Sequence, residues 1–192
     1  AFGGYDTFLV KYNSSGEKQW AQQLGTDTDD QGEGVTVDSS DNIYVIGNTS
    51  GGLDNNTNPS ASGGTSHGDK WDFFLVKYNS SGTKQWTQQL GTSSNDTAKG
   101  VVVDSSNNIY VTGDTAGGLD GNTNSGDYDI FLVKYNSSGT KQWTKQLGTS
   151  SYDYGSGLSV DSSNNIYVSA QTNGGLDGNT NSGSDDIILV KY

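Results

Sequence analysis

The stretch Asp72-Phe-Phe-Leu-Val-Lys-Tyr78 decides the fold, because near-copies of it return three more times in this chain of 192 residues. The copies are DTFLVKY from Asp6, DIFLVKY from Asp129 and DIILVKY from Asp186. Self-similarity at a nearly fixed period is the sequence signature of a repeat architecture. The chain therefore divides into units 6–71, 72–128 and 129–185 and a partial unit 186–192, which together form one repeat array over 1–192.

Each unit contains four short apolar segments separated by turn residues. In the middle of the chain these are Val101–Val103, Ile109–Thr112, Ile130–Tyr135 and Lys141–Leu147. Short runs rich in Val, Ile, Tyr, Phe and Trp, bounded by Gly, Asn, Asp and Ser, indicate strands joined as hairpins. Four antiparallel strands per repeat form the meander of a β-propeller blade, so we predict an all-β chain of propeller blades.

The first unit carries an insertion at 59–67, which has no counterpart in the later units. The inserted residues Pro-Ser-Ala-Ser-Gly-Gly-Thr-Ser-His contain the only Pro and the only His of the chain. Such a composition indicates a loop added to an otherwise regular blade.

The order of the segments predicts an incomplete ring. If Gly100-Val-Val-Val103 is an innermost strand, the chain reads as the last two strands of one blade, two complete blades and the first three strands of another. That is about three blades plus one extra strand, whereas closed propellers have roughly 4 to 8 blades. We expect the ring to be completed by further blades of a longer chain or by a second copy, whose Lys18–Leu24 adds beside Ile187–Tyr192 in a ring or filament.

The composition excludes several classes of function. Leu, Ile, Val and Phe are scarce and the net charge is −12, which is typical of disorder unless a repeat orders the apolar residues. With no Cys and one His, the chain has no thiolate site and no centre that needs two imidazoles. Because all ten basic residues are Lys, it lacks the Arg forks that bind phosphate, so we expect no nucleic acid partner.

Two further expectations concern the location of the protein. No stretch approaches the ~20 apolar residues that a membrane-spanning helix needs, so we expect no membrane insertion. The chain also has no Met, so residue 1 is expected to be a processing site or the edge of a fragment, which is consistent with export.

The recurring pattern resembles a known family. Asn108-Ile-Tyr-Val-Thr-Gly113, Gly118-Leu-Asp120, Asp129 with its Phe-Leu-Val-Lys-Tyr, and Trp143 together resemble the SBBP repeat, a bacterial seven-bladed β-propeller repeat. The resemblance covers essentially the whole chain, and it implies a secreted or cell-surface bacterial protein built from blades. A shorter piece, Asn-Ser-Ser-Gly-Thr-Lys-Gln-Trp, also resembles the blade motif of quinoprotein-like propellers.

The Asp- and Asn-rich loop after the second strand of each blade is a candidate calcium site. Calcium prefers six to eight oxygen ligands, often from alternating Asp and Asn with a Gly at the turn. The pattern Asp-x-Asn-x-Asn followed by Gly-x-x-Asp resembles the calcium loops of integrin-type propellers with one residue inserted, although the same residues also cap tight turns. The candidate ligands are Asp120, Asn122, Asn124, Asp127 and Asp129, then Asp177, Asn179, Asn181 and Asp186, and in the interrupted first copy Asp54, Asn56 and Asn58.

Aromatic residues offer an alternative function. Trp20, Trp86 and Trp143 recur once per unit, and we expect them to pack neighbouring sheets together, although a Trp ring can also stack on a sugar. Trp71 and His67 lie at or beside the insertion and are the best candidates for a local ligand contact. The cluster Asp104-Ser-Ser-Asn-Asn108 is expected to form a hairpin turn.

Near-identical units argue against a single asymmetric active site, so we do not expect an enzyme. The leading hypothesis is an extracellular structural or adhesive propeller array, which self-associates through incomplete terminal blades and is stabilised by calcium. The alternative is a carbohydrate-binding propeller. A quinoprotein-type enzyme is a third hypothesis, although the chain lacks the Arg and Cys residues that such a site is expected to use.

Overall fold

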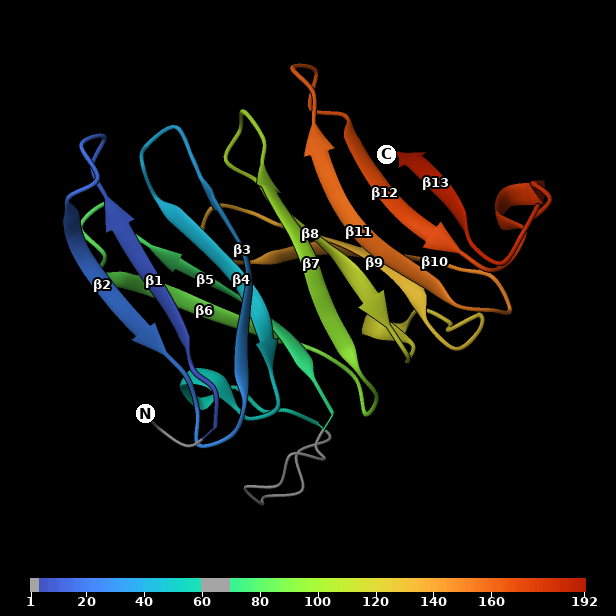
Figure 1. The fold of residues 1–192 in the computed structure, drawn as a ribbon, viewed down its shortest axis with the longest axis horizontal. Helices are drawn as coiled ribbons and strands as arrows, with labels where there is room; N and C mark the ends of the chain where they lie inside the picture. The colour runs from blue at the N-terminus through green and yellow to red at the C-terminus, as the bar shows by residue number, and fades with distance from the viewer. Residues whose placement is uncertain (1–3, 60–69) are drawn as a thin grey trace.

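The computed structural model describes residues 4–59 and 70–192, and its strands form four antiparallel sheets (Figure 1). We number these sheets blades 1 to 4 in chain order. Blade 1 has β1 (Thr7–Tyr12) and β2 (Lys18–Leu24). Blade 2 has β3 (Asp30–Val37), β4 (Ile43–Thr49), β5 (Asp72–Tyr78) and β6 (Lys84–Leu90). Blade 3 has β7 (Asp96–Val103), β8 (Ile109–Thr115), β9 (Asp129–Tyr135) and β10 (Lys141–Leu147). Blade 4 has β11 (Asp153–Val160), β12 (Ile166–Thr172) and β13 (Asp186–Lys191).

This arrangement confirms the predicted strand order. Blades 2 and 3 are complete four-stranded meanders, blade 1 holds the two outer strands of a blade, and blade 4 lacks only the outermost strand. Each copy of the repeated motif forms the third strand of a blade, so the sequence units 72–128 and 129–185 each begin in the middle of one sheet and end in the middle of the next.

The innermost strands β3, β7 and β11 lie side by side, as the crowding at Gly100 suggests (Figure 1). A Cβ atom at Gly100 would come within 2.7 Å of Leu158 Cδ2 on the next blade. The register shifts between Ala98 and Gly100, which marks a β-bulge in β7. A small residue is therefore needed where adjacent blades converge.

The apolar core lies between the blades rather than inside any one of them. Tyr44, Ile46, Phe73 and Leu75 of blade 2 pack against blade 3, whereas the alternating residues of β4 and β5 face blade 1. Phe73 and Phe131 are fully buried, and their rings stack at a centroid distance of 4.8 Å between blades 2 and 3. Each complete sheet is thus covered on both faces, which explains how so few strongly apolar residues support an ordered fold.

The remaining regular structure is short. Single 3-10 turns follow the second strand of blades 2, 3 and 4: η1 (Leu53–Asn55), η2 (Leu119–Gly121) and η3 (Leu176–Gly178). Within the described ranges, no helix has the length or apolar character needed to cross a membrane. His67 and most of the predicted insertion lie outside the described residues.

Candidate functional site

The predicted calcium loop of blade 3 divides into two parts, and the first part is attached to the outer strand. Asp120 has a φ of 55°; its carboxylate pairs with Lys141 and accepts a hydrogen bond of 2.9 Å from Thr144 Oγ1. Burial tends to raise the pKa of Asp120, but the hydrogen bonds from these two residues outweigh it and lower that pKa. Blade 2 repeats the arrangement, with Asp54 Oδ1 at 2.5 Å from Lys84 Nζ.

The next residue of the predicted ligand set caps the 3-10 turn. The side-chain amide of Asn122 donates to the carbonyl oxygen of Leu119 at 2.8 Å. Asn56 and Asn179 make the same bond to the residue three positions before them, at 2.7 and 2.9 Å. Their amide groups therefore support the turn, as Asn side chains commonly do.

The second part of the loop brings Asn124 and Asp129 together. Gln146 Nε2 donates to Asn124 Oδ1 at 3.1 Å and to Asp129 Oδ2 at 2.9 Å. Asp129 is completely buried, and its Oδ1 atom has no hydrogen-bond partner. Asp127, between them in sequence, is exposed.

The other two copies keep bonds to the equivalent Asp and differ at the Asn. Gln89 Nε2 donates to Asp72 Oδ2 at 2.9 Å in blade 2, and the Ser182–Asp186 bond of blade 4 matches the one from Ser125 N to Asp129 Oδ2 at 2.8 Å in blade 3. Asn58 donates to the carbonyl oxygen of Lys70 at 2.8 Å. In blade 4, Asp186 accepts from the backbone of Ser182 at 2.9 Å, and Asn181 Oδ1 accepts from Gly183 N at 2.9 Å. Asp177 is exposed.

These positions bear on the fit of the loop to calcium. In blade 3 the oxygens available to a cation are those of Asn124 and Asp129, because Asp120 is turned toward Lys141. Across residues 4–59 and 70–192, no three acidic or His side chains come close enough together to hold a metal ion. The buried Oδ1 of Asp129 is the atom that fits a cation best, and the loop as a whole offers fewer oxygens than calcium prefers.

A second set of carboxylates, which the sequence reasoning missed, lies buried at the junctions between successive blades. Asp96 and Asp153 begin the innermost strands β7 and β11, and both are fully buried. Asp72, which begins β5 and is the blade 2 equivalent of Asp129, is also fully buried, and the charge of Asp96 acts on it. Burial raises the pKa of Asp72 to about 7, although a bond from Gln89 partly offsets it and the charge of Asp96 adds to it. Burial also raises the pKa of Asp96.

A repeated motif could have revealed Asp96 and Asp153. In each copy a Gly-Thr pair precedes the Asp, as in Gly91-Thr92 before Asp96. Thr92 donates to Asp96 Oδ2 from its backbone nitrogen at 2.6 Å and from its hydroxyl at 2.8 Å. The spacing Gly-Thr-x-x-x-Asp is therefore a structural signature, since the Thr anchors a carboxylate that would otherwise be costly to bury.

The cluster Asp104–Asn108 forms the predicted hairpin turn, between β7 and β8. Asp104 accepts hydrogen bonds from the backbone nitrogens of Ser106 and Asn108, from the Asn108 side chain, and from Tyr110 Oη, at 2.8 to 3.1 Å. Asn107 takes the left-handed conformation with a φ of 60°. The same network recurs around Asp38 and Asp161.

Replacing Asp104 with alanine is expected to lower the free energy of unfolding by about 1–3 kcal/mol, because Tyr110 Oη and two backbone N–H groups lose their acceptor. Urea unfolding followed by tryptophan fluorescence measures this change. Ser106→Ala, which keeps the backbone bond in the same turn, serves as the control and should cost much less. Equal losses in the two variants would contradict this role of the carboxylate.

The recurring tryptophans pack between blades, as predicted. A Cβ atom at Gly82, which has a φ of 82°, would lie 2.9 Å from the Trp20 ring of the preceding blade, and Gly139 stands in the same relation to Trp86. Within a blade, Tyr44 and Trp86 lie at a centroid distance of 6.0 Å, with Lys77 Nζ 5.2 Å from the Tyr44 ring centroid. Blade 3 repeats this group.

Trp71 lies beside a cluster of tyrosines at the junction of blades 3 and 4. Asn95 connects them: its Oδ1 accepts from Trp71 N at 3.2 Å, and its amide donates to Tyr128 Oη at 3.1 Å. Tyr128, Tyr152 and Tyr154 have ring centroids 5.4 to 6.2 Å apart, and the last two are exposed. Asn95 thus links the backbone of Trp71 to the tyrosine cluster.

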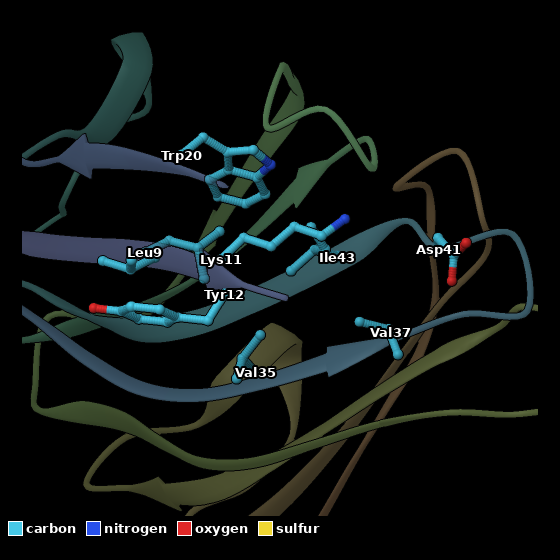
Figure 2. A pocket seen from close by; sticks show the side chains of 9 residues that line it. Leu9, Lys11, Tyr12, Trp20, Val35, Val37, Asp41 and Ile43 are labelled. Carbon is cyan, nitrogen blue, oxygen red and sulfur yellow. The ribbon is translucent and has the colours of Figure 1, made fainter. Parts of the chain in front are cut away.

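A groove of about 320 Å³ lies between blade 1 and blade 2. Figure 2 shows the side chains of Leu9, Lys11 and Trp20 on one side of it and those of Val35 and Val37 on the other. In blades 2 and 3 the corresponding space holds the tyrosine of the second strand. Among the described residues blade 1 has only β1 and β2, and the groove is open there.

The two end blades also expose apolar faces. Phe8 of β1 is 74% exposed, whereas Phe74 and Phe131, at the same repeat position, are completely buried. At the other end, Ile187 and Leu189 of β13 are 86% and 71% exposed. Each end face is therefore a blade interface without its neighbouring blade.

Together, the stacked four-stranded blades and their repeated turns define a β-propeller repeat protein. The chain belongs to the SBBP family of beta-propeller repeats, whose sequence pattern matches residues 19–54, 85–120 and 142–177. Each match covers the fourth strand of one blade and the first two strands of the next, up to the 3-10 turn.

Curated relatives share this repeat at low identity. The regulatory protein FlaEY of Caulobacter vibrioides is 29% identical over 179 residues, which cover 90% of this chain and 19% of that protein. The uncharacterized WD repeat-containing protein L264 of Acanthamoeba polyphaga mimivirus is 28% identical over 186 residues, which cover 81% of this chain and 13% of that protein. The chain spans less than one fifth of either relative, and both are named as regulatory or repeat proteins rather than as enzymes.

Proposed function

We propose that this chain is a structural or adhesive propeller array that works outside the cell or at its surface and associates through its incomplete end blades. The partner is a second copy of the chain or further blades of the same repeat. Low apolar content, many Asp residues and the absence of Cys and Arg are consistent with a scaffold that has no familiar catalytic centre. No enzymatic activity is part of this proposal.

The observation that carries the proposal is the contrast between equivalent residues in inner and end blades. Phe8 is exposed where Phe74 is buried, and Ile187 is exposed where Phe73 is buried. Exposed apolar surfaces that are contiguous with a repeat interface favour association, because covering them removes apolar area from water. Nearest-neighbour contacts are also the main source of stability in stacked repeats.

Sedimentation velocity over a range of concentrations tests the proposal. The sedimentation coefficient should rise with concentration as the 20.2 kDa chain associates. A double variant, Phe8→Ser and Ile187→Ser, removes apolar surface from both ends and should shift the equilibrium toward the monomer. A folded monomer at every concentration would refute self-association of this chain.

Calcium stabilisation is a further part of the proposal. It is supported by Asp129, whose buried Oδ1 has no hydrogen-bond partner. Its Oδ2 and the Oδ1 of Asn124 both accept hydrogen bonds from Gln146 Nε2, so these oxygens lie close together. Calorimetric titration should give heat and a higher melting temperature in the parent chain and neither in Asp129→Asn. No heat and no shift in the parent chain would remove calcium from the account.

Carbohydrate binding is the second candidate function, favoured by the tyrosine cluster beside Trp71. Tyr152 and Tyr154 expose aromatic rings beside Tyr128, whose hydroxyl accepts from the amide of Asn95, and such a group of rings and polar atoms can stack on a sugar face and bind its hydroxyl groups. A glycan array should show binding that is lost in Tyr154→Ala and Trp71→Ala and retained in Tyr12→Ala, which lies at the opposite end. Absence of binding in the parent chain would exclude this candidate on that array.

A further inference from the structure

The tyrosine cluster at the junction of blades 3 and 4 is fixed in place by the backbone. Tyr128 directly precedes β9, Tyr152 directly precedes β11, and Tyr154 is the second residue of β11. The carbonyl oxygen of Tyr128 accepts from Asp153 N at 2.8 Å, and Tyr128 and Tyr152 form an isolated parallel bridge. The cluster is therefore anchored to two neighbouring blades.

The three rings of the cluster lie close together and present aromatic surface to solvent. Their centroids are 5.4 to 6.2 Å apart, and their planes are within 37° of parallel. The side chains of Tyr152 and Tyr154 are 41% and 37% exposed. At the rim, Tyr128 Oη accepts from the side-chain amide of Asn95 at 3.1 Å. Nearly parallel rings bordered by polar atoms suit the flat face and the hydroxyl groups of a sugar.

A carboxylate stands beside these rings. A Cβ atom at Gly126 would lie 2.5 Å from the carbonyl oxygens of Thr149 and Ser151, so the loop before β9 packs directly against the turn before β11. Asp127 follows Gly126 in this loop; it is exposed, and it makes no hydrogen bond or ion pair with any other described residue. Its negative charge acts on Tyr154, so the carboxylate lies near that phenol.

The ionisable groups that act on Tyr154 are all acidic. Burial raises the pKa of Tyr154, and the two neighbouring phenols and the charges of Asp114 and Asp127 raise it further. Lys99 acts on Asp114, but it is not among the groups that act on Tyr154. The surroundings of this ring therefore favour a positively charged ligand and disfavour an anionic one.

Elsewhere the chain supplies its own cations to tyrosine rings. Three lysines of the third strands place Nζ 5.2 to 5.4 Å from a ring centroid, in the pairs Lys77–Tyr44, Lys134–Tyr110 and Lys191–Tyr167. An ammonium group over an aromatic face is attracted by the quadrupole of the ring. In the part of the chain that the structure describes, no lysine lies over a ring of the tyrosine cluster, so this position is open to an ammonium group from outside.

We propose that the tyrosine cluster binds glycans that carry free, protonated amino groups. This rests on the carbohydrate-binding candidate above and names the class of sugar. The sugar ring stacks on Tyr152 and Tyr154, and its ammonium group lies between the rings and the carboxylate of Asp127. Glycans that carry carboxylate or sulfate groups are repelled by the same aspartate.

Two oligosaccharides of equal length test this assignment. Calorimetric titration in mildly acidic buffer, which keeps the amines protonated, compares a linear glucosamine tetramer with its N-acetylated form. The two share one backbone and differ in charge. The parent chain should bind the glucosamine tetramer at least about tenfold more tightly. Equal affinity for the two would overturn the amino-sugar assignment while carbohydrate binding survives, and binding of neither would remove both proposals.

Variants separate the contribution of the charge from that of the rings. Asp127→Asn should lower the affinity for the glucosamine tetramer to that for the acetylated one, whereas Tyr154→Ala and Tyr152→Ala should weaken the binding of both. Asp41→Asn is the matched control, because it also removes an exposed carboxylate and introduces the residue that blade 3 has at the same position, Asn107. A preference that persists in Asp127→Asn, or that falls equally in Asp41→Asn, would contradict the proposal.

A lysine-rich peptide offers the same ammonium group and is the competing occupant. The flexible stem of a lysine covers less of three nearly parallel rings than a rigid sugar ring does, so the rings favour the glycan. Tetralysine should therefore bind at least about tenfold more weakly than the glucosamine tetramer. Equal binding of the two would show that charge alone is recognised, and it would overturn the assignment to a sugar.

Discussion

Replacing Phe131 with alanine is expected to lower the free energy of unfolding by about 3–5 kcal/mol, because the ring is fully buried between two sheets. Phe131 stacks on Phe73 at 4.8 Å, and a Cβ atom at Gly113 would lie only 2.9 Å from its Cζ atom. Both neighbours are held by their own sheets, so a cavity at this position cannot easily collapse. Denaturant unfolding monitored by circular dichroism measures the loss.

The chain provides a matched control for this prediction. Phe8 occupies the same repeat position in blade 1 but is 74% exposed. Phe8→Ala should therefore leave the unfolding free energy of the monomer nearly unchanged, and its cost should appear as weaker association. Similar losses in the unfolding of both monomers would contradict the claim that burial between blades, rather than the residue type, gives the repeat its stability.

The second large effect concerns pH. The folded chain should lose stability as pH rises from about 4 to 7, because burial raises the pKa of Asp72 from 3.8 to about 7. In that range the folded state binds a proton that the unfolded state has released, so each pH unit costs roughly 1.4 kcal/mol of the free energy of unfolding until the folded carboxyl also ionises. Asp96, whose pKa burial also raises, adds to the same slope.

Asp72→Asn isolates this contribution. The variant keeps an oxygen for the bond from Gln89, which is 2.9 Å from Asp72 Oδ2, and removes the charge. Melting curves from pH 5 to 8 should show that the free energy of unfolding falls less steeply with pH in the variant, by the amount that corresponds to about one bound proton. The variant should also be at least as stable as the parent at pH 8. The exposed Asp127→Asn is the control. A parent chain that gains stability from pH 5 to 8 would contradict the raised pKa.

The fold was predictable from the sequence because its signals are local and repeated. The motif from Asp72 to Tyr78 and the turn at Asp104 each use residues that are close in sequence, and each recurs. The order of partial and complete blades followed directly from where the motif begins and ends in each copy. A propeller blade pairs consecutive strands, so little long-range information is needed.

The candidate site was predictable only in part, because its partners come from other strands. Asp120 has the residue type and spacing of a calcium ligand, but its pairing with Lys141 becomes visible only when β10 is placed beside η2. The burial of Asp72 likewise depends on the junction of two blades, which the spacing along one strand does not reveal. The groove beside Trp20 arises from a strand that blade 1 lacks, so no residue pattern marks it.

The central claim is that the end faces of this chain are blade interfaces that a second copy covers. Hydrogen–deuterium exchange at a series of protein concentrations tests it most directly, with β9 as the internal reference that is already covered on both faces. The account predicts that amides in β1 and β13 become more protected as concentration rises, approaching the protection of β9. Exchange in both end strands that does not depend on concentration would contradict the account.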